Sequence, residues 1–419
     1  MRSAYGSAVA SAQPGLCVPP HLPPPPRGRT VVVGVGKAAA AMAQAVEDHW
    51  SGPLSGVVVV PPGAVLPLRQ VRVLEGSHPV PDARSVLAGQ ALLAAVAGLG
   101  PEDLVIALVS GGGSALCALP IDGVSLADKQ AITQALLLRG ASITEINTVR
   151  RHLSAIKGGR LAAAAHPAQV VTLLVSDIPG DDPALIASGP TLADTTTCQD
   201  ALGVLERYGV NDLPAVALGL AQGRWESVKP ADPRLSGHTH RVVASAWTGL
   251  QAAAETVRRA GWPCHILSDA VEGEAREVAK VHAALALSVA QRGAPFAAPC
   301  VLLSGGEATV TVRGGGRGGR NTEFVLALAL ALEGRPEAHR VWGLSAGTDG
   351  LDGRAGAAGA WTWPGALAQA RLLGHTPLSA LDGNDSATLL AAVDGLVVTG
   401  PTHTNINDIR IVVVGPPQA

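Results

Sequence analysis

The strongest constraint on the fold is an alternation of short β-branched runs with Ala- and Leu-rich stretches. Apolar runs at 31–35, 57–60, 104–109 and 170–175 have the length and composition of buried parallel strands. Between such runs, stretches such as 38–49 carry apolar residues at helical spacing. Strand, turn and helix in this order predict a doubly wound α/β sheet that binds ligands at the carboxyl ends of its strands.

The pattern returns in the second half of the chain, with apolar runs near 241–245, 301–304, 341–345, 395–399 and 409–414. A length of 419 residues favours two domains, and residues 211–238 have the Pro, Gly and polar content of a linker. We therefore expect an α/β protein of two three-layer α/β/α domains, 1–235 and 236–419. Their sheets should be mainly parallel, with an active-site cleft between them. The prolines of 19–26 predict a stiff, extended lead-in.

Composition excludes several classes of function. The formal net charge of −2 and the lack of a basic stripe argue against binding to nucleic acid or to an anionic membrane. The N-terminus lacks a signal-peptide core, and no segment approaches the roughly 18 apolar residues of a membrane span, so we expect a cytoplasmic protein. Five cysteines without CxxC or metal spacing predict reduced structural thiols: Cys17, Cys117, Cys198, Cys264 and Cys300.

Serine and glycine directly follow three of the predicted strands. The first of these loops, Ser110-Gly111-Gly112-Gly113-Ser114, would expose successive backbone N–H groups between two hydroxyls. Such a loop predicts a nest for an anion, because a tight turn alone would require only one glycine. Similar loops occur at 304–307 and 345–350.

A lysine stands at the start of the first predicted helix. Gly34-Val35-Gly36-Lys37-Ala38-Ala39 fits the G-x-G-x-x-A pattern of dinucleotide-binding turns. The second strand, however, runs into Pro61-Pro62-Gly63 without the carboxylate that would bind a ribose. The charge of Lys37 opposes the helix dipole, and a bound anion would reverse that penalty. We therefore expect Lys37 to be functional.

Basic residues are concentrated at 147–160 in a chain of otherwise low charge. Helical spacing would place Arg150 and Lys157 along one side. This segment predicts either an anion site or a solvated helix face that ends at a glycine cap.

Three carboxylates follow the strand at 170–175, those of Asp177, Asp181 and Asp182. Carboxylate oxygens at a strand end can hold Mg²⁺. N-capping of a helix would account for one of the three, but not for all of them.

The segment 313–323 combines three arginines with five glycines. We expect such a loop to become ordered only when something anionic binds it. Arg320 would stand at the N-terminus of a helix over 324–332, where its guanidinium and the backbone could hold a phosphate together. The alternative is a disordered tether. The polar turn at 399–408 is expected to support the other loops.

Taken together, these motifs resemble the class II glycerate 2-kinase family. The resemblance runs from about Val31 to Arg410, and the carboxyl-terminal region looks like a MOFRL domain. Its motifs are Gly36-Lys37-Ala38, Glu75–Asp82, the triple-glycine loop, Asn147–Arg160, Ser176–Thr191 and Gly314–Asn321. Thr322 stands where many members have Gln, and His403 where Gly is common.

This resemblance implies phosphorylation of D-glycerate to 2-phosphoglycerate by an enzyme that uses ATP and Mg²⁺. It implies a Rossmann-like glycerate kinase domain at 1–235, a MOFRL-type domain at 236–419, and glycerate and ATP as partners. The sequence leaves the oligomeric state open, with a homodimer as one candidate assembly. In family members, the lysine of the Gly-Lys-Ala turn and the arginine of the Gly-Gly-Arg-Asn loop are the proposed active-site residues, and these are Lys37 and Arg320 here. Asp177 or a neighbour would bind the metal or accept the hydroxyl proton. The candidates are Lys37, Arg320 and Asp177 for catalysis; Gly36, Ser77, Ser110, Gly111, Gly112, Gly113, Ser114, Asn147, Arg150, Lys157, Glu307, Gly319, Asn321, Asp349 and Asp385 for substrate or nucleotide binding; and Asp177, Asp181 and Asp182 for the metal.

Two other functions are consistent with parts of the sequence. The Gly34–Ala39 match would suit an NAD(P)H-dependent hydroxypyruvate reductase, a name that some relatives carry, although the missing ribose carboxylate argues against it. A non-catalytic protein that binds a sugar acid or a nucleotide would keep the loops without turnover.

Overall fold

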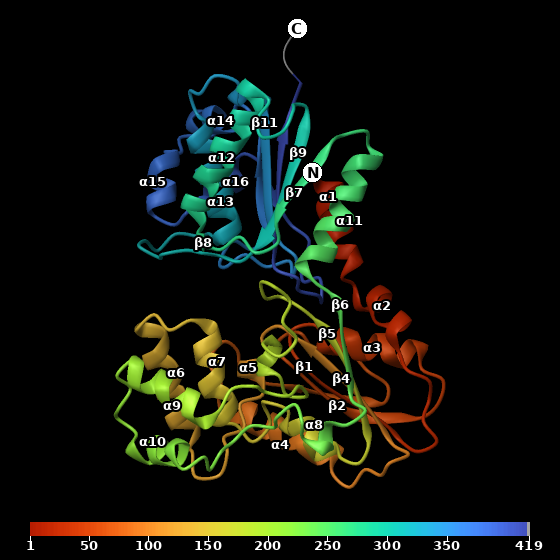
Figure 1. Ribbon diagram of the computed structural model, residues 1–419. Coiled ribbons are helices and arrows are strands. Elements are labelled where there is room, and N and C mark those ends of the chain that lie inside the picture. Colours follow the sequence, from red (N-terminus) through yellow and green to blue (C-terminus); the bar gives the residue numbers. More distant parts are fainter. Residues whose placement is uncertain (417–419) are drawn as a thin grey trace. The chain divides into compact units, whose positions relative to one another are not determined.

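The computed structural model describes residues 1–416 and divides into two compact units (Figure 1). The N-terminal unit comprises Pro14–Ser176 and Asp181–Val243, and the C-terminal unit comprises Met1–Gln13, Asp177–Gly180 and Ala244–Ala419. The main division therefore lies near 243, a few residues beyond the expected boundary at 235. The first 13 residues belong to the C-terminal unit, whereas the sequence suggested the opposite assignment.

The N-terminal unit is built on a six-stranded sheet in the order β3-β2-β1-β4-β5-β6. Its strands are β1 (Thr30–Val35), β2 (Leu54–Val60), β3 (Val71–Glu75), β4 (Leu104–Ser110), β5 (Gln169–Val175) and β6 (Thr239–Ala244). The pairs β1–β2, β1–β4, β2–β3 and β4–β5 are parallel, as predicted. Helix α3 (Ala39–His49) packs on β1, β2 and β4 on one face, while α4 (Ala83–Val96) and α8 (Arg160–Ala165) pack together on the other.

A cluster of helices extends this unit on one side (Figure 1). It consists of α6 (Leu126–Leu138), α7 (Ile143–His152), α9 (Cys198–Arg207) and α10 (Pro214–Ala221), and it has its own hydrophobic core, which includes Leu220 and Trp225. The expected linker at 211–238 is therefore wrong, because α10 and Trp225 are part of this core. The shorter elements of the unit are α2 (Pro14–Cys17), η1 (Pro19–His21), α5 (Gly113–Leu116), η2 (Ile186–Ser188) and η3 (Pro233–Leu235).

The strand at 239–244, which the sequence suggested would open the second sheet, is the edge strand β6 of the first sheet. The C-terminal sheet is also six-stranded, in the order β13-β12-β11-β14-β9-β7. Its strands are β7 (Cys264–Ser268), β9 (Cys300–Gly306), β11 (Val341–Gly347), β12 (Gly359–Thr362), β13 (Leu396–Val397) and β14 (Asp408–Val414).

Strand direction is the main difference between the two sheets. Only β7–β9 is parallel in the C-terminal sheet as described, and the pairs β9–β14, β11–β14, β11–β12 and β12–β13 are antiparallel. The α/β class, with helices layered on two sheets, is confirmed, but the antiparallel pairs of the second sheet differ from the four parallel pairs given for the first. The sequence could not reveal this, because strands buried on both faces have continuous apolar runs in either direction.

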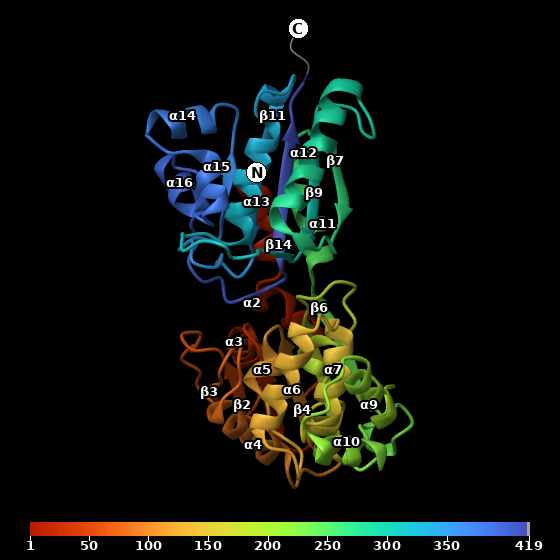
Figure 2. The same cartoon turned by 90° about the vertical axis from the view of Figure 1, so that its left-hand side faces the viewer.

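Alternate residues of the C-terminal strands face different helices. Val301 and Leu303 pack with α1 (Arg2–Ser11) and α11 (Ala246–Arg259), whereas Cys300 and Leu302 pack with α12 (Ala275–Arg292) and α13 (Arg320–Leu332). Figure 2 shows α14 (Ala366–Leu372), α15 (Pro377–Asp382) and α16 (Ser386–Ala392) beside α13. The remaining elements are β8 (Gly273–Glu274), β10 (Ala308–Thr309) and η4 (Ala338–Arg340).

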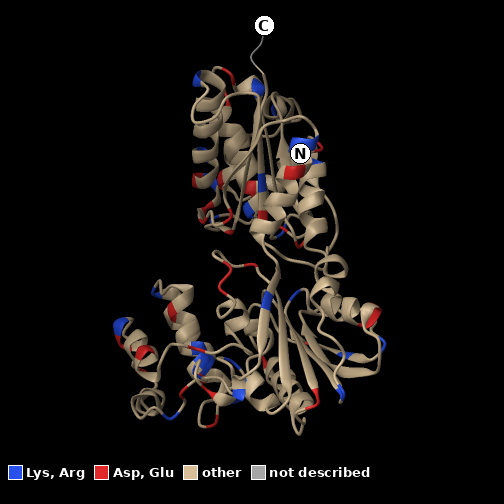
Figure 3. Cartoon of the chain, turned by 45° about the vertical axis from the view of Figure 1, so that its right-hand side comes forward, with Lys and Arg blue, Asp and Glu red and all other residues tan. Residues whose placement is uncertain are grey.

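Along the ribbon, the positions of basic and acidic residues are interspersed in each unit, without a continuous run of basic positions among the described residues in this view (Figure 3). This distribution agrees with the formal net charge of −2. Among residues 1–416, no helix combines the length and the apolarity that crossing a membrane requires.

Candidate active site

The loops after β1 and β4 are joined through their backbones. The N–H groups of Lys37 and Ala38 donate to Gly111 O (2.9 Å) and Ser110 Oγ (3.0 Å), and the N–H of Gly36 donates to a β2 carbonyl (3.0 Å). Gly36 has a φ of +134°, and a Cβ there would lie 2.2 Å from Ser110 Oγ, so only glycine fits. The backbone N–H groups of Gly36, Lys37 and Ala38, which would bind the phosphates of a dinucleotide, thus already donate hydrogen bonds to other residues at the edge of the sheet.

Lys37 and His78 flank the triple-glycine loop. A Cβ on Gly112 would lie 3.2 Å from His78 Cδ2 and 3.5 Å from Lys37 Cγ, so both side chains approach this residue closely. Desolvation by the surrounding atoms, followed by the Lys37 ammonium, lowers the pKa of His78, although part of the residue stays exposed to solvent. A neutral imidazole and an ammonium therefore lie on the same side of the loop.

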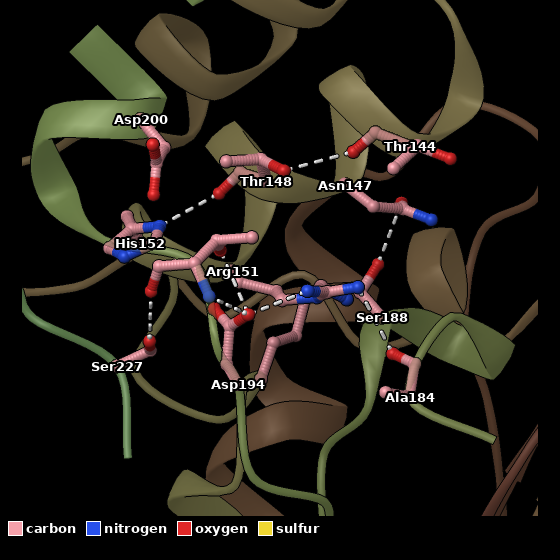
Figure 4. A network of polar contacts seen from close by, with 12 residues as sticks. Thr144, Asn147, Thr148, Arg151, His152, Ala184, Ser188, Asp194, Asp200 and Ser227 are labelled. Carbon is pink, nitrogen blue, oxygen red and sulfur yellow. Dashed lines mark hydrogen bonds and ion pairs between the residues drawn. The ribbon is translucent and has the colours of Figure 1, made fainter. Parts of the chain in front are cut away.

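The triple-glycine loop meets a chain of hydroxyl groups. Ser188 Oγ donates to Asn147 Oδ1 (3.0 Å, Figure 4), so the bond between Ser188 Oγ and Ser114 Oγ (2.9 Å) has Ser114 as its donor. Ala187 and Ser188 both have left-handed backbones, with φ of 53° and 61°, and such strain is concentrated at functional sites. The amides of Gly113 and Ser114 make no hydrogen bond within the described part of the chain.

The basic segment 147–160 does not form a solvated helix face. Its buried cations Arg151 and Lys157 bind groups of the protein itself instead of pointing toward a ligand. Lys157 is buried and donates to Ser114 O (2.7 Å) and Cys117 O (2.9 Å), so its ammonium supports the loop from behind. Burial and the like charge of Arg150 lower the pKa of Lys157 to about 8. Arg151 forms a buried ion pair with Asp194 at 2.7 Å (Figure 4).

Ser77 is part of a helix cap. Its hydroxyl donates to Asp82 Oδ2 (3.0 Å) and accepts from Arg84 Nη2 (2.9 Å), at the N-terminus of α4. These contacts account for Ser77 without a ligand. Arg150 is half-buried on α7, one helical turn beyond Asn147.

Arg320 is held by two carboxylates in the C-terminal unit. Its Nε donates to Asp408 Oδ2 (2.8 Å), and its Nη1 donates to Glu307 Oε1 (2.6 Å). Burial of Arg320 disfavours its charge, but Asp408, Glu307 and Asp349 outweigh that effect and raise its pKa above the ordinary range. The guanidinium is therefore permanently charged and fixed in direction.

The N-terminus of α13 already carries an anion. Asp352 accepts hydrogen bonds from the amides of Asn321 and Thr322, both at 2.9 Å, and a Cβ on Gly319 would lie 2.3 Å from its Oδ1. Asn321 is buried and donates through Nδ2 to Asp408 Oδ1 (2.9 Å). The expectation that this helix end and Arg320 hold a phosphate together is therefore wrong, because Asp352 occupies the amides.

The glycine-rich loop is ordered by the chain itself, contrary to the expectation that it needs a ligand. Asn384 Oδ1 accepts from the amides of Arg313 (2.7 Å) and Gly314 (2.9 Å), and Asp385 Oδ1 accepts from that of Arg317 (2.8 Å). Close backbone contacts at 314, 316 and 318 leave no room for a Cβ. Asp385 thus orders the loop, and the many glycines are explained by close packing rather than by flexibility.

Asp177 is held by the polar turn at 399–408. Its Oδ2 accepts from Asn405 Nδ2 (2.8 Å), and Asn407 donates to its carbonyl, which agrees with the expected supporting role of that turn. Asp181 and Asp182 belong to the N-terminal unit. Asp182 Oδ1 accepts from Ala184 N (2.9 Å), as in a helix cap. The role of the three residues as metal ligands stays a prediction.

Several residues of these sites escaped the sequence reasoning. Asp408 is the last residue of the polar turn at 399–408 and precedes the last apolar run, whereas site residues were expected at the carboxyl ends of strands. Because β14 is antiparallel, Asp408 pairs with Gly306 and Gly347 at the carboxyl ends of β9 and β11. His78 lies within the Glu75–Asp82 motif but is not among the candidate site residues of the sequence. His403, which stands where Gly is common, has a φ of 59°, and a left-handed backbone explains that preference.

Comparisons with known proteins cover nearly the whole chain. The family model described as Domain of unknown function (DUF4147) matches residues 1–220, and the MOFRL family model matches 300–408. A protein of Agrobacterium vitis that carries the provisional name hydroxypyruvate reductase is 51% identical, over 99% of this chain and 94% of the relative.

Relatives named as kinases match over the same length. The D-glycerate 2-kinase of Thermotoga maritima is 38% identical over 96% of this chain and 95% of its own, and the glycerate kinase of Homo sapiens is 35% identical over 99% and 92%. The crystal structure of the Thermotoga maritima glycerate kinase superposes with a TM-score of 0.88, at 38% identity, over 98% of both chains.

Proposed function

Because the chain belongs to the glycerate 2-kinase family, we propose that it transfers a phosphoryl group from ATP to the 2-hydroxyl of D-glycerate. The product is 2-phosphoglycerate. The observation that favours this function over reduction of hydroxypyruvate is the bonding of the turn after β1. The amides of Gly36, Lys37 and Ala38 all donate within the sheet edge, so the G-x-G-x-x-A match provides no cradle for the pyrophosphate of NAD(P)H.

The N-terminal unit contributes Lys37 and the triple-glycine loop. The Lys37 side chain acts on the transferred phosphoryl group or on the glycerate carboxylate. The amides of Gly113 and Ser114 make no hydrogen bond among the described residues, which leaves them able to bind an anion. Lys157 holds the carbonyl of Ser114 from behind (2.7 Å) and so keeps the loop in position.

The C-terminal unit contributes Arg320, whose positive charge neutralises the negative charge of the phosphoryl group or of the glycerate carboxylate. Phosphoryl transfer depends on positioning and charge neutralisation more than on covalent chemistry. Asp408 and Glu307 fix the guanidinium before substrate binds, so little reorganisation is needed in the reaction. Asn321 and Asp349 support this arrangement from the same edge of the sheet.

The carboxylates of Asp177, Asp181 and Asp182 are the proposed Mg²⁺ ligands or, in the case of Asp177, the group that accepts the hydroxyl proton. Their oxygen chemistry suits Mg²⁺, and the Asp181 carboxylate and Asp182 Oδ2 make no hydrogen bond among residues 1–416. When bound with ATP, Mg²⁺ would neutralise phosphate charge.

A coupled assay with ATP and D-glycerate tests the proposal, with the position of the phosphate on the product read by NMR. Lys37→Met and Arg320→Met should each lower kcat by about 10²–10³-fold. The control is Lys280→Met, because Lys280 is exposed and forms an ion pair with the exposed Glu277. Wild-type kcat in Lys37→Met would remove that residue from the chemistry.

The same preparation distinguishes the alternatives. Oxidation of NADH with hydroxypyruvate, together with no turnover of ATP and glycerate, would support the reductase instead. Absence of both activities, with glycerate or ATP still bound, would support a non-catalytic binding protein.

A further inference from the structure

Three potential metal ligands from three separate segments meet at one point of the N-terminal unit. They are His152 at the end of α7, Cys198 at the start of α9 and Glu226 in the loop after α10. Their ligand atoms all lie within 4.8 Å of one another, and no other group of this kind occurs among residues 1–416. His152 and Cys198 are buried, while Glu226 is 39% exposed, which leaves an entry path for an ion.

The hydrogen bonds of His152 specify its tautomer. Nδ1 lies 2.8 Å from the carbonyl oxygen of Thr148, which can only accept, so Nδ1 carries a hydrogen (Figure 4). Nε2 lies 3.3 Å from Glu226 Oε1, and a carboxylate oxygen is also an acceptor. A neutral ring would therefore place two lone pairs against each other, and this conflict is removed either by a second ring proton or by a metal cation bound to both atoms.

The spacing suits a tetrahedral ion. Two ligands about 2.0–2.1 Å from Zn²⁺ at the tetrahedral angle are about 3.3–3.4 Å apart, and Nε2 and Oε1 are 3.3 Å apart. Histidine ligands of metals commonly donate their other ring N–H to a carbonyl, as His152 does to Thr148. A set of nitrogen, sulfur and oxygen ligands favours Zn²⁺ over Mg²⁺.

We propose that His152, Cys198 and Glu226 bind one Zn²⁺ ion, with water as the fourth ligand, at a structural site separate from the phosphoryl-transfer residues. The ion would hold α7, α9 and the 226 loop together at the edge of the helical cluster. Because α7 also carries Asn147, the site would stabilise the helix that contacts Ser188. This inference does not depend on the proposed kinase activity.

Lys229 competes with the ion for Glu226. Its Nζ lies 2.5 Å from Glu226 Oε1, so an ion can use this oxygen only if the ammonium moves. Lys229 also donates to Ser227 Oγ (2.7 Å) and to the Thr196 carbonyl, and it keeps these partners when it leaves Glu226. Removing the ammonium should therefore tighten binding, which a purely structural His–Glu pair would not predict.

The full-length chain, freed of metal with a chelator, is titrated with Zn²⁺ by calorimetry and separately with Co²⁺ by absorption spectroscopy. We expect one equivalent of Zn²⁺ to bind and to raise Tm. Co²⁺ should give a thiolate charge-transfer band and the intense visible bands of a tetrahedral site. Lys229→Met should tighten Zn²⁺ binding by about 10-fold.

Cys198→Ser should abolish the charge-transfer band and weaken Zn²⁺ binding by about 100-fold or more. This loss is larger than that expected for a residue that only hydrogen-bonds to a metal ligand. Cys264→Ser is the matched control, because Cys264 is a buried cysteine of the C-terminal unit and should leave both readouts unchanged. If wild-type protein shows no stoichiometric Zn²⁺ binding and no thiolate band, the site is a histidine–glutamate ion pair and the proposal is wrong. The wild-type spectrum decides this even if a variant fails to fold.

Discussion

Asp408 offers the sharpest test of how Arg320 is positioned. Its side chain is fully buried, and it accepts from Arg320 Nε at 2.8 Å and from Asn321 Nδ2 at 2.9 Å. It is also the carboxylate nearest the buried Arg410, at 3.5 Å. Asp408→Asn keeps the shape of the residue but removes the charge, and its NH₂ group would face one of these donors.

The size of the effect follows from burial. Removing one partner of a buried ion pair costs about 3–5 kcal/mol, and Arg410, which is 1% exposed, would lose that carboxylate. Arg320 is 27% exposed and keeps Glu307, so its share of the loss is smaller. We expect Asp408→Asn to lower the free energy of unfolding by about 3–5 kcal/mol. It should lower kcat by about 10²-fold, because the guanidinium is no longer held in position.

Urea unfolding and the ATP–glycerate assay measure the two effects. Glu307→Gln is the comparison for stability, because that ion pair is exposed and should contribute about 0–1 kcal/mol. Equal unfolding midpoints for the two variants would contradict the account of Asp408. A stable Asp408→Asn protein with wild-type kcat would show that Arg320 needs no buried partner.

Three further predictions concern stability. Gly316→Ala should cost about 1–3 kcal/mol, because its Cβ would lie 2.5 Å from that of Asp385, whereas Gly315→Ala has nothing within 4 Å and should change stability by less than about 1 kcal/mol; equal urea midpoints would contradict the packing of this loop. Burial lowers the pKa of His282 to about 4 from 6.5, so the unfolded chain binds more protons as pH falls between these values. The contribution of His282 to the free energy of unfolding should be fully present above about pH 6.5 and should fall by up to about 3 kcal/mol toward pH 4. Urea midpoints measured across this pH range should decline less steeply for His282→Gln than for the wild type. Tyr5→Phe removes a buried 2.8 Å hydrogen bond from α1 to the carbonyl of residue 347 and should lower the free energy of unfolding by about 0.5–1.5 kcal/mol; an unchanged urea midpoint would show that this bond does not anchor α1.

Local patterns in the sequence were sufficient for most strands and helices of the N-terminal unit. The helix expected at 38–49 is Ala39–His49, and the strand expected at 104–109 is Leu104–Ser110. These elements follow from side-chain periodicity, which is a property of neighbouring residues. The motif order over most of the chain also pointed to the family that the comparisons show.

Contacts between distant segments were decided only by the tertiary structure. Asp352 caps a helix that begins 32 residues earlier at Arg320, and Asn384 orders a loop about 70 residues earlier in the chain. Neither partner has a local signal, because a carboxylate or amide that binds distant backbone resembles any polar loop residue.

The direction of β14 had the largest consequence. Its apolar run predicts a buried strand in either direction, and only the assembled sheet shows that it is antiparallel to β9 and β11. Asp408 therefore lies at the edge where Arg320 needs a partner. The sequence alone determined which residues form strands and carry charge, but the pairing of strands decided which charges meet, because hydrogen bonding between strands does not depend on their distance along the chain.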